Sequence, residues 1–256
     1  MKTLQEKLLA HEKPVGTFVA TGSAMVVDCL GCAGLDFVIL DNEHSPIEAE
    51  TTCQMIRAAE ARGLSPLVRV REISRPAILK VLDIGAEGII IPDVHSVEDV
   101  AQVVACAKYY PVGQRGFCPT RKDGWGRSEP GTVMETMERL NRRTLVIPQC
   151  ETADALAQIR QIAAMEGVDG VFIGPFDLSI SMGIPGQFEH PDFQAALREI
   201  LAACHAAGKP CLMFAANGAA AQSRLAEGYD GIALGLDTTL LIDAVEAQLH
   251  QIEGRE

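Results

Sequence analysis

Acidic side chains close two of the short apolar runs in this sequence. Glu151 ends the run 145–151, and Asp177 stands near the end of the segment 170–178. Two such carboxylates suit Mg²⁺ or Mn²⁺, because these ions bind through one or two carboxylates and keep positions for water and substrate oxygens. Either acid alone could equally cap a helix. The pair together favours a divalent-metal site.

Side chains suited to proton transfer and anion binding stand at similar positions. His44 follows the acidic end of the run 37–43, where an imidazole could transfer a proton. Arg69, in the run 66–71, could form a plain ion pair or hold an oxyanion with its planar donor fork. Gln149 stands two residues before Glu151, and alternate residues of a strand share one face. These types together indicate metal-assisted chemistry on an anionic substrate.

A repeated strand–helix rhythm must position these side chains. Eight apolar runs alternate with helical patterns, which is typical of parallel strands covered by helices. The runs span residues 15–20, 37–43, 66–71, 88–94, 145–151, 170–178, 210–215 and 231–237. They predict one α/β domain over residues 1–256, a (β/α)8 TIM barrel with its chemistry at the carboxyl ends of the strands. A doubly wound open sheet is the alternative, although no GxGxxG follows the first run.

Composition limits the partners. A formal net charge of −12 argues against nucleic acid and anionic membranes, because their phosphates would repel the chain. The sequence has no apolar run long enough to cross a membrane and no signal-peptide pattern, so we expect a cytoplasmic protein. Cys29 and Cys32 form the one CxxC, which we interpret as small buried residues, since no second pair or histidine completes a zinc site.

The segment 111–130 departs furthest from the rhythm. We expect it to lie over the barrel mouth as a long loop after the fourth strand. Arg121, Lys122 or Arg127 could bind an anionic aldehyde there, or they could be solvated loop charges. Trp125 in the same segment is interpreted as a packing anchor. The histidines other than His44 are interpreted as structural.

The combination of motifs is similar to one known family. "FVILDNEHSP", "PQCET" and "GVFIGPFDLSISMG" occur in order with "PLVRV" and "LGLDTTLL". Together they resemble the metal-dependent (class II) 2-oxo-acid aldolases, typified by hydroxy-oxo-heptanedioate aldolase and 2-keto-3-deoxy sugar-acid aldolases and related to the citrate lyase β subunit. The resemblance covers nearly the whole chain and is weakest over 114–128.

The resemblance implies roles at individual positions. Glu151 and Asp177 correspond to metal ligands, and Arg69 to an arginine that binds the keto oxygen of pyruvate. His44 resembles the histidine that handles protons, with Asp41 beside it. Asp83 matches an acid that a neighbouring subunit supplies to this histidine. The implied substrate-binding residues are Arg69, Gln149, Gly174, Pro175, Phe176 and Asp177.

The resemblance also implies an activity. It is the reversible cleavage of a 4-hydroxy-2-oxo acid to pyruvate and an aldehyde, through an enolate held on Mg²⁺, Mn²⁺ or Co²⁺, in aromatic-compound or sugar-acid catabolism. A related carbon–carbon lyase, an oxaloacetate decarboxylase and a non-catalytic binding barrel are the alternatives. The family implies a homohexamer, a trimer of dimers, with the apolar segment 238–252 exchanged between subunits.

Overall fold

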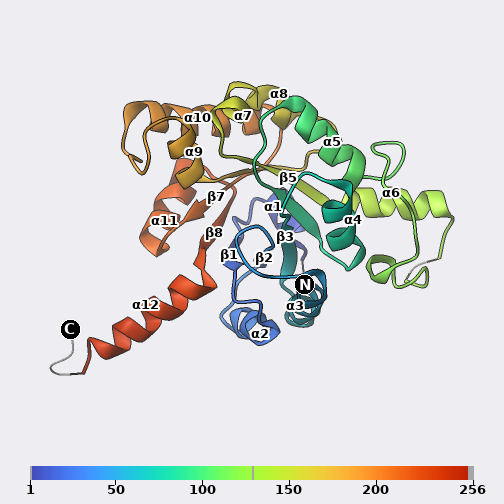
Figure 1. Ribbon diagram of the computed structural model, residues 1–256, viewed down its shortest axis with the longest axis horizontal. Coiled ribbons are helices and arrows are strands. Elements are labelled where there is room, and N and C mark those ends of the chain that lie inside the picture. Colours follow the sequence, from blue (N-terminus) through green and yellow to red (C-terminus); the bar gives the residue numbers. More distant parts are fainter. Residues whose placement is uncertain (1, 129, 253–256) are drawn as a thin grey trace.

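The chain folds into a closed barrel of eight parallel strands. The structure, a computed structural model, describes residues 2–128 and 130–252 (Figure 1). Each strand pairs with the next along the chain, and β8 pairs with β1. The strands are β1 (Val15–Val19), β2 (Phe37–Asp41), β3 (Ser65–Arg69), β4 (Gly88–Ile91), β5 (Leu145–Cys150), β6 (Val171–Ile173), β7 (Cys211–Ala215) and β8 (Gly231–Leu236). The predicted TIM barrel is confirmed, and the open-sheet alternative is wrong.

Helices surround this barrel and join successive strands (Figure 1). They are α1 (Leu4–Leu9), α2 (Ala24–Cys32), α3 (Ala49–Arg62), α4 (Arg75–Asp83), α5 (Val97–Ala107), α6 (Val133–Arg143), α7 (Ala153–Ala157), α8 (Ile159–Ala164), α9 (Pro175–Ser181), α10 (Pro191–Ala206), α11 (Gly218–Glu227) and α12 (Asp237–Leu249). Side-chain caps start many of them, as at Ser96, which accepts from Asp99 N in a capping box. Within the described residues no helix is both long and apolar enough to span a membrane.

Alternate strand residues fill the barrel interior, as the two-residue period of a strand requires. The interior cluster contains Phe18, Phe37, Ile39, Leu67, Ile90, Leu145, Ile147, Phe172, Leu212 and Ala233. Leu4 and Leu8 of α1 join this cluster, and Leu4 N donates to Ser65 Oγ at the start of β3. Helix α1 therefore closes the amino end of the barrel, which leaves the carboxyl end open for a site.

The sixth strand is shorter than the sequence predicts. The segment 170–178 was expected to form one strand ending beside Asp177, but β6 ends at Ile173. Gly174 is the N-cap of α9, and Pro175 occupies its first turn. Proline favours that position because its fixed φ suits a helix and its missing N–H needs no partner there. Asp177 thus belongs to the first turn of a helix and not to a strand end.

The segment 111–130 lies at the opposite end of the barrel from the one expected. Only residues 92–96 separate β4 from α5, so the long segment follows α5 and begins where that helix ends. Arg121 donates to the Ile84 carbonyl and Lys122 to the Ala86 carbonyl, just before β4 begins. The segment therefore contacts the amino end of the barrel of its own chain. The expectation that it covers the mouth of this barrel is wrong.

Two expectations about buried side chains are also wrong. Cys29 and Cys32 are exposed on α2. Trp125 is 67% exposed, with φ at 56°, and does not anchor its loop within the chain. Both errors have one cause, because the sequence shows that a residue is apolar but not which helix face or loop side meets the core.

Candidate active site

Polar side chains continue the inward-facing rows of the barrel at its carboxyl end. Asp41 follows Phe37 and Ile39 on β2, Arg69 follows Leu67 on β3, and Gln149 follows Leu145 and Ile147 on β5, each at a two-residue spacing. All three polar side chains are buried. Strands β2 and β3 pair Asp41 directly with Arg69. The last inward position on each of these three strands is therefore polar, although the inward residue directly before it on the strand is apolar.

Asp41 holds Arg69 in one orientation. Arg69 Nε donates to Asp41 Oδ1 at 2.9 Å, and Arg69 Nη2 donates to Asp41 Oδ2 at 2.7 Å. Such a bidentate pair is strong and directional. Asp41 Oδ1 also accepts from the backbone of Glu43 and His44. Asp41 was expected beside His44, and it contacts the backbone of His44 while its carboxylate fixes the guanidinium.

Glu151 lies at the centre of the polar layer. Its Oε1 accepts from Asp93 N at 2.7 Å, and its Oε2 accepts from the amide of Gln149. Burial raises the pKa of Glu151 to about 7, against the effect of the Asp93 hydrogen bond, and the nearby carboxylates of Asp177 and Glu43 raise it further. Protonation of one carboxylate, or binding of a cation, reduces the electrostatic repulsion between Glu151 and these two carboxylates.

Gly174 lets the backbone approach these groups closely. A Cβ at this position would lie 2.6 Å from Gln149 Nε2 and 2.7 Å from Glu151 Oε2, so any larger residue would displace these two side chains. The glycine therefore permits the start of α9 to pass against the polar layer. That helix start carries Pro175, and Asp177 in its first turn lines the same cavity as Arg69 and Gln149.

These residues fit a divalent cation. Gln149 Oε1 is a buried oxygen that accepts no hydrogen bond from the described part of the chain. Glu151 and Asp177 supply two carboxylates, the number that Mg²⁺ and Mn²⁺ use when substrate and water complete the shell. No group of three or more His, Cys, Asp or Glu in residues 2–128 and 130–252 forms a metal site. A site with two protein carboxylates is consistent with that finding.

The carboxylate pair lies between two cavities of different chemistry. The smaller cavity, about 160 Å³, is lined by Arg69 and Gln149 together with several phenylalanine side chains. The larger groove, about 680 Å³, contains both Glu151 and Asp177 together with His44. Asp177 lines both spaces. The sequence-predicted residues at positions 41, 44, 69, 149, 151 and 174–177 thus converge at one end of the barrel.

Glu43 belongs to this site although sequence reasoning gave it no role. Its Oε2 lies 3.2 Å from Arg69 Nη1 and 3.7 Å from His44 Nε2. Burial raises the pKa of Glu43, Arg69 and His44 oppose the shift, and the carboxylates of Asp41 and Asp177 reinforce it. The "EH" pair in the sequence was the available signal, because the acid directly precedes the histidine.

His95, which the sequence analysis interpreted as structural, also lies in this part of the barrel. Its Nδ1 lies 3.0 Å from Asp154 and its Nε2 lies 2.9 Å from Asp93, and it lines the larger groove with His44. Hydrogen bonds to these two carboxylates raise the pKa of His95. No local pattern predicts the arrangement, because Asp154 is 59 residues away in the sequence.

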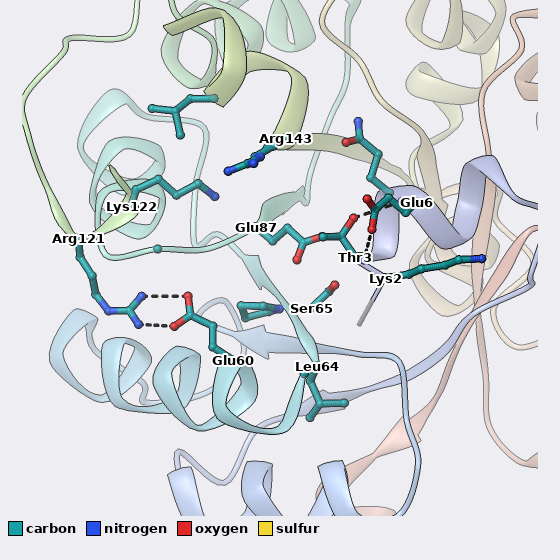
Figure 2. Close-up of a pocket in the computed structure, with 15 residues that line it drawn as sticks. Lys2, Thr3, Glu6, Glu60, Leu64, Ser65, Glu87, Arg121, Lys122 and Arg143 are labelled. Atoms are coloured by element: carbon teal, nitrogen blue, oxygen red, sulfur yellow. Dashed lines mark hydrogen bonds and ion pairs between the residues drawn. The ribbon is translucent and has the colours of Figure 1, made fainter. Parts of the chain in front are cut away.

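Asp83 does not lie near His44 within the chain. It ends α4 at the amino end of the barrel, where its Oδ1 accepts from Arg115 Nη2 at 2.7 Å. Figure 2 shows a pocket at the same end, with Arg121 bonded to Glu60 and Lys122 close by. These cations of the long loop therefore do not reach the site of their own chain. The expected role of Asp83 in a neighbouring subunit stays a prediction.

A barrel with polar side chains at this end is typical of (β/α)8 enzymes, whose active sites lie at the carboxyl ends of the strands. Comparison with known proteins makes the class specific, because residues 15–244 match the HpcH/HpaI aldolase/citrate lyase family. The chain belongs to that family, and it is an enzyme of this aldolase and lyase group. The predicted relationship is confirmed.

Similar proteins support the assignment along the whole chain. The 2-keto-3-deoxy-L-rhamnonate aldolase of Escherichia coli K12 is 34% identical over 252 residues, which cover 98% of this chain and 92% of the relative. The 2-dehydro-3,6-dideoxy-6-sulfogluconate aldolase of Pseudomonas putida is 33% identical over 97% of this chain and 96% of its own. The crystal structure of the HpcH/HpaI aldolase from Desulfitobacterium hafniense DCB-2 has a TM-score of 0.90 at 30% identity, with 100% of both chains covered.

Proposed function

We propose that this single-domain enzyme is a divalent-metal-dependent aldolase that reversibly cleaves a 4-hydroxy-2-oxo acid to pyruvate and an aldehyde. One observation carries the proposal. Asp177 lines one cavity with the fixed guanidinium of Arg69 and an adjoining groove with Glu151, so two carboxylates and an oxyanion donor flank neighbouring spaces. This combination suits a 2-oxo acid, which presents a keto oxygen and a carboxylate side by side. The names of the two curated relatives point to the same substrate class.

Glu151 and Asp177 would hold the metal, proposed to be Mg²⁺, Mn²⁺ or Co²⁺. When bound, such an ion acts as a Lewis acid that stabilises negative charge on a keto oxygen. Burial raises the pKa of Glu151 to about 7. Below that pH a cation must displace a proton from Glu151, so metal affinity should decrease as the pH falls.

Arg69 would bind the keto oxygen and stabilise the enolate charge that develops there. Asp41 accepts from two of the five N–H groups of Arg69, and Glu43 Oε2 lies 3.2 Å from Nη1, which leaves at least one further donor on Nη2. Because Asp41 fixes the guanidinium before substrate arrives, no reorganisation is needed during the reaction. The substrate carboxylate would lie against the backbone of Gly174, Pro175 and Phe176, which line the same cavity as Arg69.

His44 would remove a proton from the methyl carbon of pyruvate and return it in the reverse reaction. Its imidazole is 67% exposed in the larger groove, close enough to Glu43 for an ion pair at 3.7 Å. An exposed imidazole can exchange its proton with water between turnovers. We propose that Asp83 of a neighbouring subunit orients this imidazole in the assembly.

We propose that the assembly is a homohexamer in which α12 packs against a neighbouring subunit. Helix α12 extends away from the barrel (Figure 1). Its apolar side chains are largely exposed, among them Leu241, Ile242 and Val245. Exposed contiguous apolar surface of this kind is characteristic of an interface.

Cleavage of a 4-hydroxy-2-oxo acid tests the activity. Chelator should abolish pyruvate release, and added Mg²⁺, Mn²⁺ or Co²⁺ should restore it; full activity in chelator would reject the metal. Oxaloacetate should be measured in parallel, since CO₂ release without aldehyde-dependent turnover would favour a decarboxylase. Failure to exchange the pyruvate methyl protons would favour a non-catalytic binding barrel.

A further inference from the structure

The loop between β4 and α5 supplies a backbone donor to the proposed metal site. Asp93 N donates to Glu151 Oε1 at 2.7 Å. The φ of Asp93 is 53°, in the left-handed region that residues other than glycine rarely adopt, although Asp and Asn tolerate it best. The direction of this N–H therefore depends on an uncommon backbone conformation of one loop residue. A contact that stabilises Asp93 in this conformation also stabilises the hydrogen bond to Glu151.

His95 connects the side chain of Asp93 to the segment that follows Glu151. Its Nε2 lies 2.9 Å from Asp93 Oδ1, and its Nδ1 lies 3.0 Å from Asp154 Oδ2. Asp154 belongs to the first turn of α7, shortly after Glu151 in the chain. An imidazole donates from both nitrogens only when it is protonated, and the two carboxylates raise the pKa of His95 toward that form. Asp93, His95 and Asp154 together form what we call the His95 bridge.

Backbone contacts hold the same two segments together beside the His95 bridge. Thr152 Oγ1 donates to the Val94 carbonyl at 2.6 Å, and Gln158 Nε2 donates to the His95 carbonyl at 3.0 Å. These bonds fix the part of the loop that follows Asp93 against α7. The His95 bridge acts on Asp93 itself, so it adds an anchor at the residue whose N–H meets the proposed metal ligand.

We infer that Asp93 and His95 are positioning residues for Glu151, and that they raise the affinity of the site for a divalent cation. The inference rests on the proposed function and deepens it. An N–H on one carboxylate oxygen orients the group and favours its charged form, which is the form that binds a cation. The His95 bridge keeps the backbone of Asp93 in the conformation that aims this N–H at Glu151.

The exposure of the His95 bridge separates positioning from stability. The side chains of His95, Asp93 and Asp154 are 51%, 81% and 69% exposed. Ion pairs between side chains this exposed add little to the stability of a fold. A loss of metal affinity without a loss of stability is therefore the effect that distinguishes a positioning role from a purely structural one.

Calorimetric titration with Mn²⁺ tests this role. His95→Ala and Asp154→Ala each remove one part of the bridge and should raise the Kd of Mn²⁺ about tenfold, as is typical for a residue that orients a metal ligand. The double variant should lose no more affinity than either single variant, because both act through the same bridge. Asp93→Asn should bind Mn²⁺ nearly as the wild type does, since asparagine keeps the acceptor oxygen and tolerates a positive φ.

His205→Ala is the matched control. His205 Nε2 lies 3.0 Å from Asp230 Oδ2, which is another exposed imidazole–carboxylate contact, at the amino end of the barrel. This variant should leave the Kd of Mn²⁺ unchanged. Urea unfolding of His95→Ala should resemble that of the wild type.

The same titrations separate the inference from the proposed function. Unchanged Mn²⁺ affinity in Glu151→Gln would remove Glu151 from the ligand set, and it would reject the proposed metal site and the inference together. Weakened binding in Glu151→Gln but wild-type binding in His95→Ala and Asp154→Ala would reject the inference alone. Additive losses in the double variant would also reject it. A loss in Asp93→Asn as large as in His95→Ala would indicate direct binding by the Asp93 carboxylate and would overturn the positioning role.

Discussion

Replacement of Arg69 by lysine should separate its role as an oxyanion donor from its role as a charge. The guanidinium donates to both oxygens of Asp41 at 2.9 and 2.7 Å, and Arg69 lines the smaller cavity with N–H groups that Asp41 does not use. A lysine ammonium in contact with Asp41 cannot also reproduce a rigid fork aimed at the substrate. Removing one preorganised oxyanion donor costs on the order of 10²- to 10³-fold in kcat. We therefore expect Arg69→Lys to lose about 10²-fold or more in kcat.

The assay is cleavage of a 4-hydroxy-2-oxo acid with saturating metal, with circular dichroism to confirm the fold. Arg62→Lys is the matched control, because Arg62 makes the same bidentate pair with Asp28, at 2.6 and 2.9 Å, on the exposed surface. Arg69→Ala would be less informative, since it leaves the buried Asp41 charge unpaired and destabilises the fold by about 3–5 kcal/mol. A folded Arg69→Lys variant with kcat within threefold of the wild type would refute the oxyanion role.

Three other predictions concern the metal, the barrel base and the assembly. Glu151→Gln should weaken metal binding at least tenfold in calorimetric titration while the fold persists, and unchanged affinity would remove Glu151 from the ligand set. Burial lowers the pKa of Lys122 from 10.5 to about 8, so between these values the unfolded state binds more protons and stability should rise with pH. Relative to Lys122→Met, the wild type should gain up to about 3 kcal/mol in free energy of unfolding by urea from pH 7 to pH 10.5; parallel profiles would contradict this. Paired glutamate substitutions of Leu241 and Val245 should dissociate the assembly in light scattering, and an unchanged mass would exclude α12 from the interface.

The inward-facing polar layer could be predicted because it obeys a local rule. Arg69 and Gln149 continue the same alternate positions that carry Leu67 and Ile147 toward the barrel interior. A strand with a two-residue period places every second residue on one face, whatever the rest of the chain does. The two-residue period of each strand was therefore enough to predict that these side chains point into the barrel.

Features that depend on helix starts or on distant segments could not be predicted in this way. Asp177 was placed at a strand end, but Pro175 starts a helix two residues earlier. His95, in the loop before α5, contacts Asp154 of α7, and no spacing in the sequence relates the two. The long segment 111–130 was assigned to the wrong end of the barrel because its position depends on whether a helix precedes it.

The most direct test of the account is deuterium exchange into the methyl group of pyruvate, followed by NMR in the absence of any aldehyde. This exchange reports proton transfer at the methyl carbon alone, the step that Arg69, His44 and Glu151 are proposed to support. The account predicts exchange with added Mg²⁺, Mn²⁺ or Co²⁺, and loss of exchange in chelator and in Glu151→Gln. Exchange that continues undiminished in chelator, or that never occurs with any of the three metals, would contradict it.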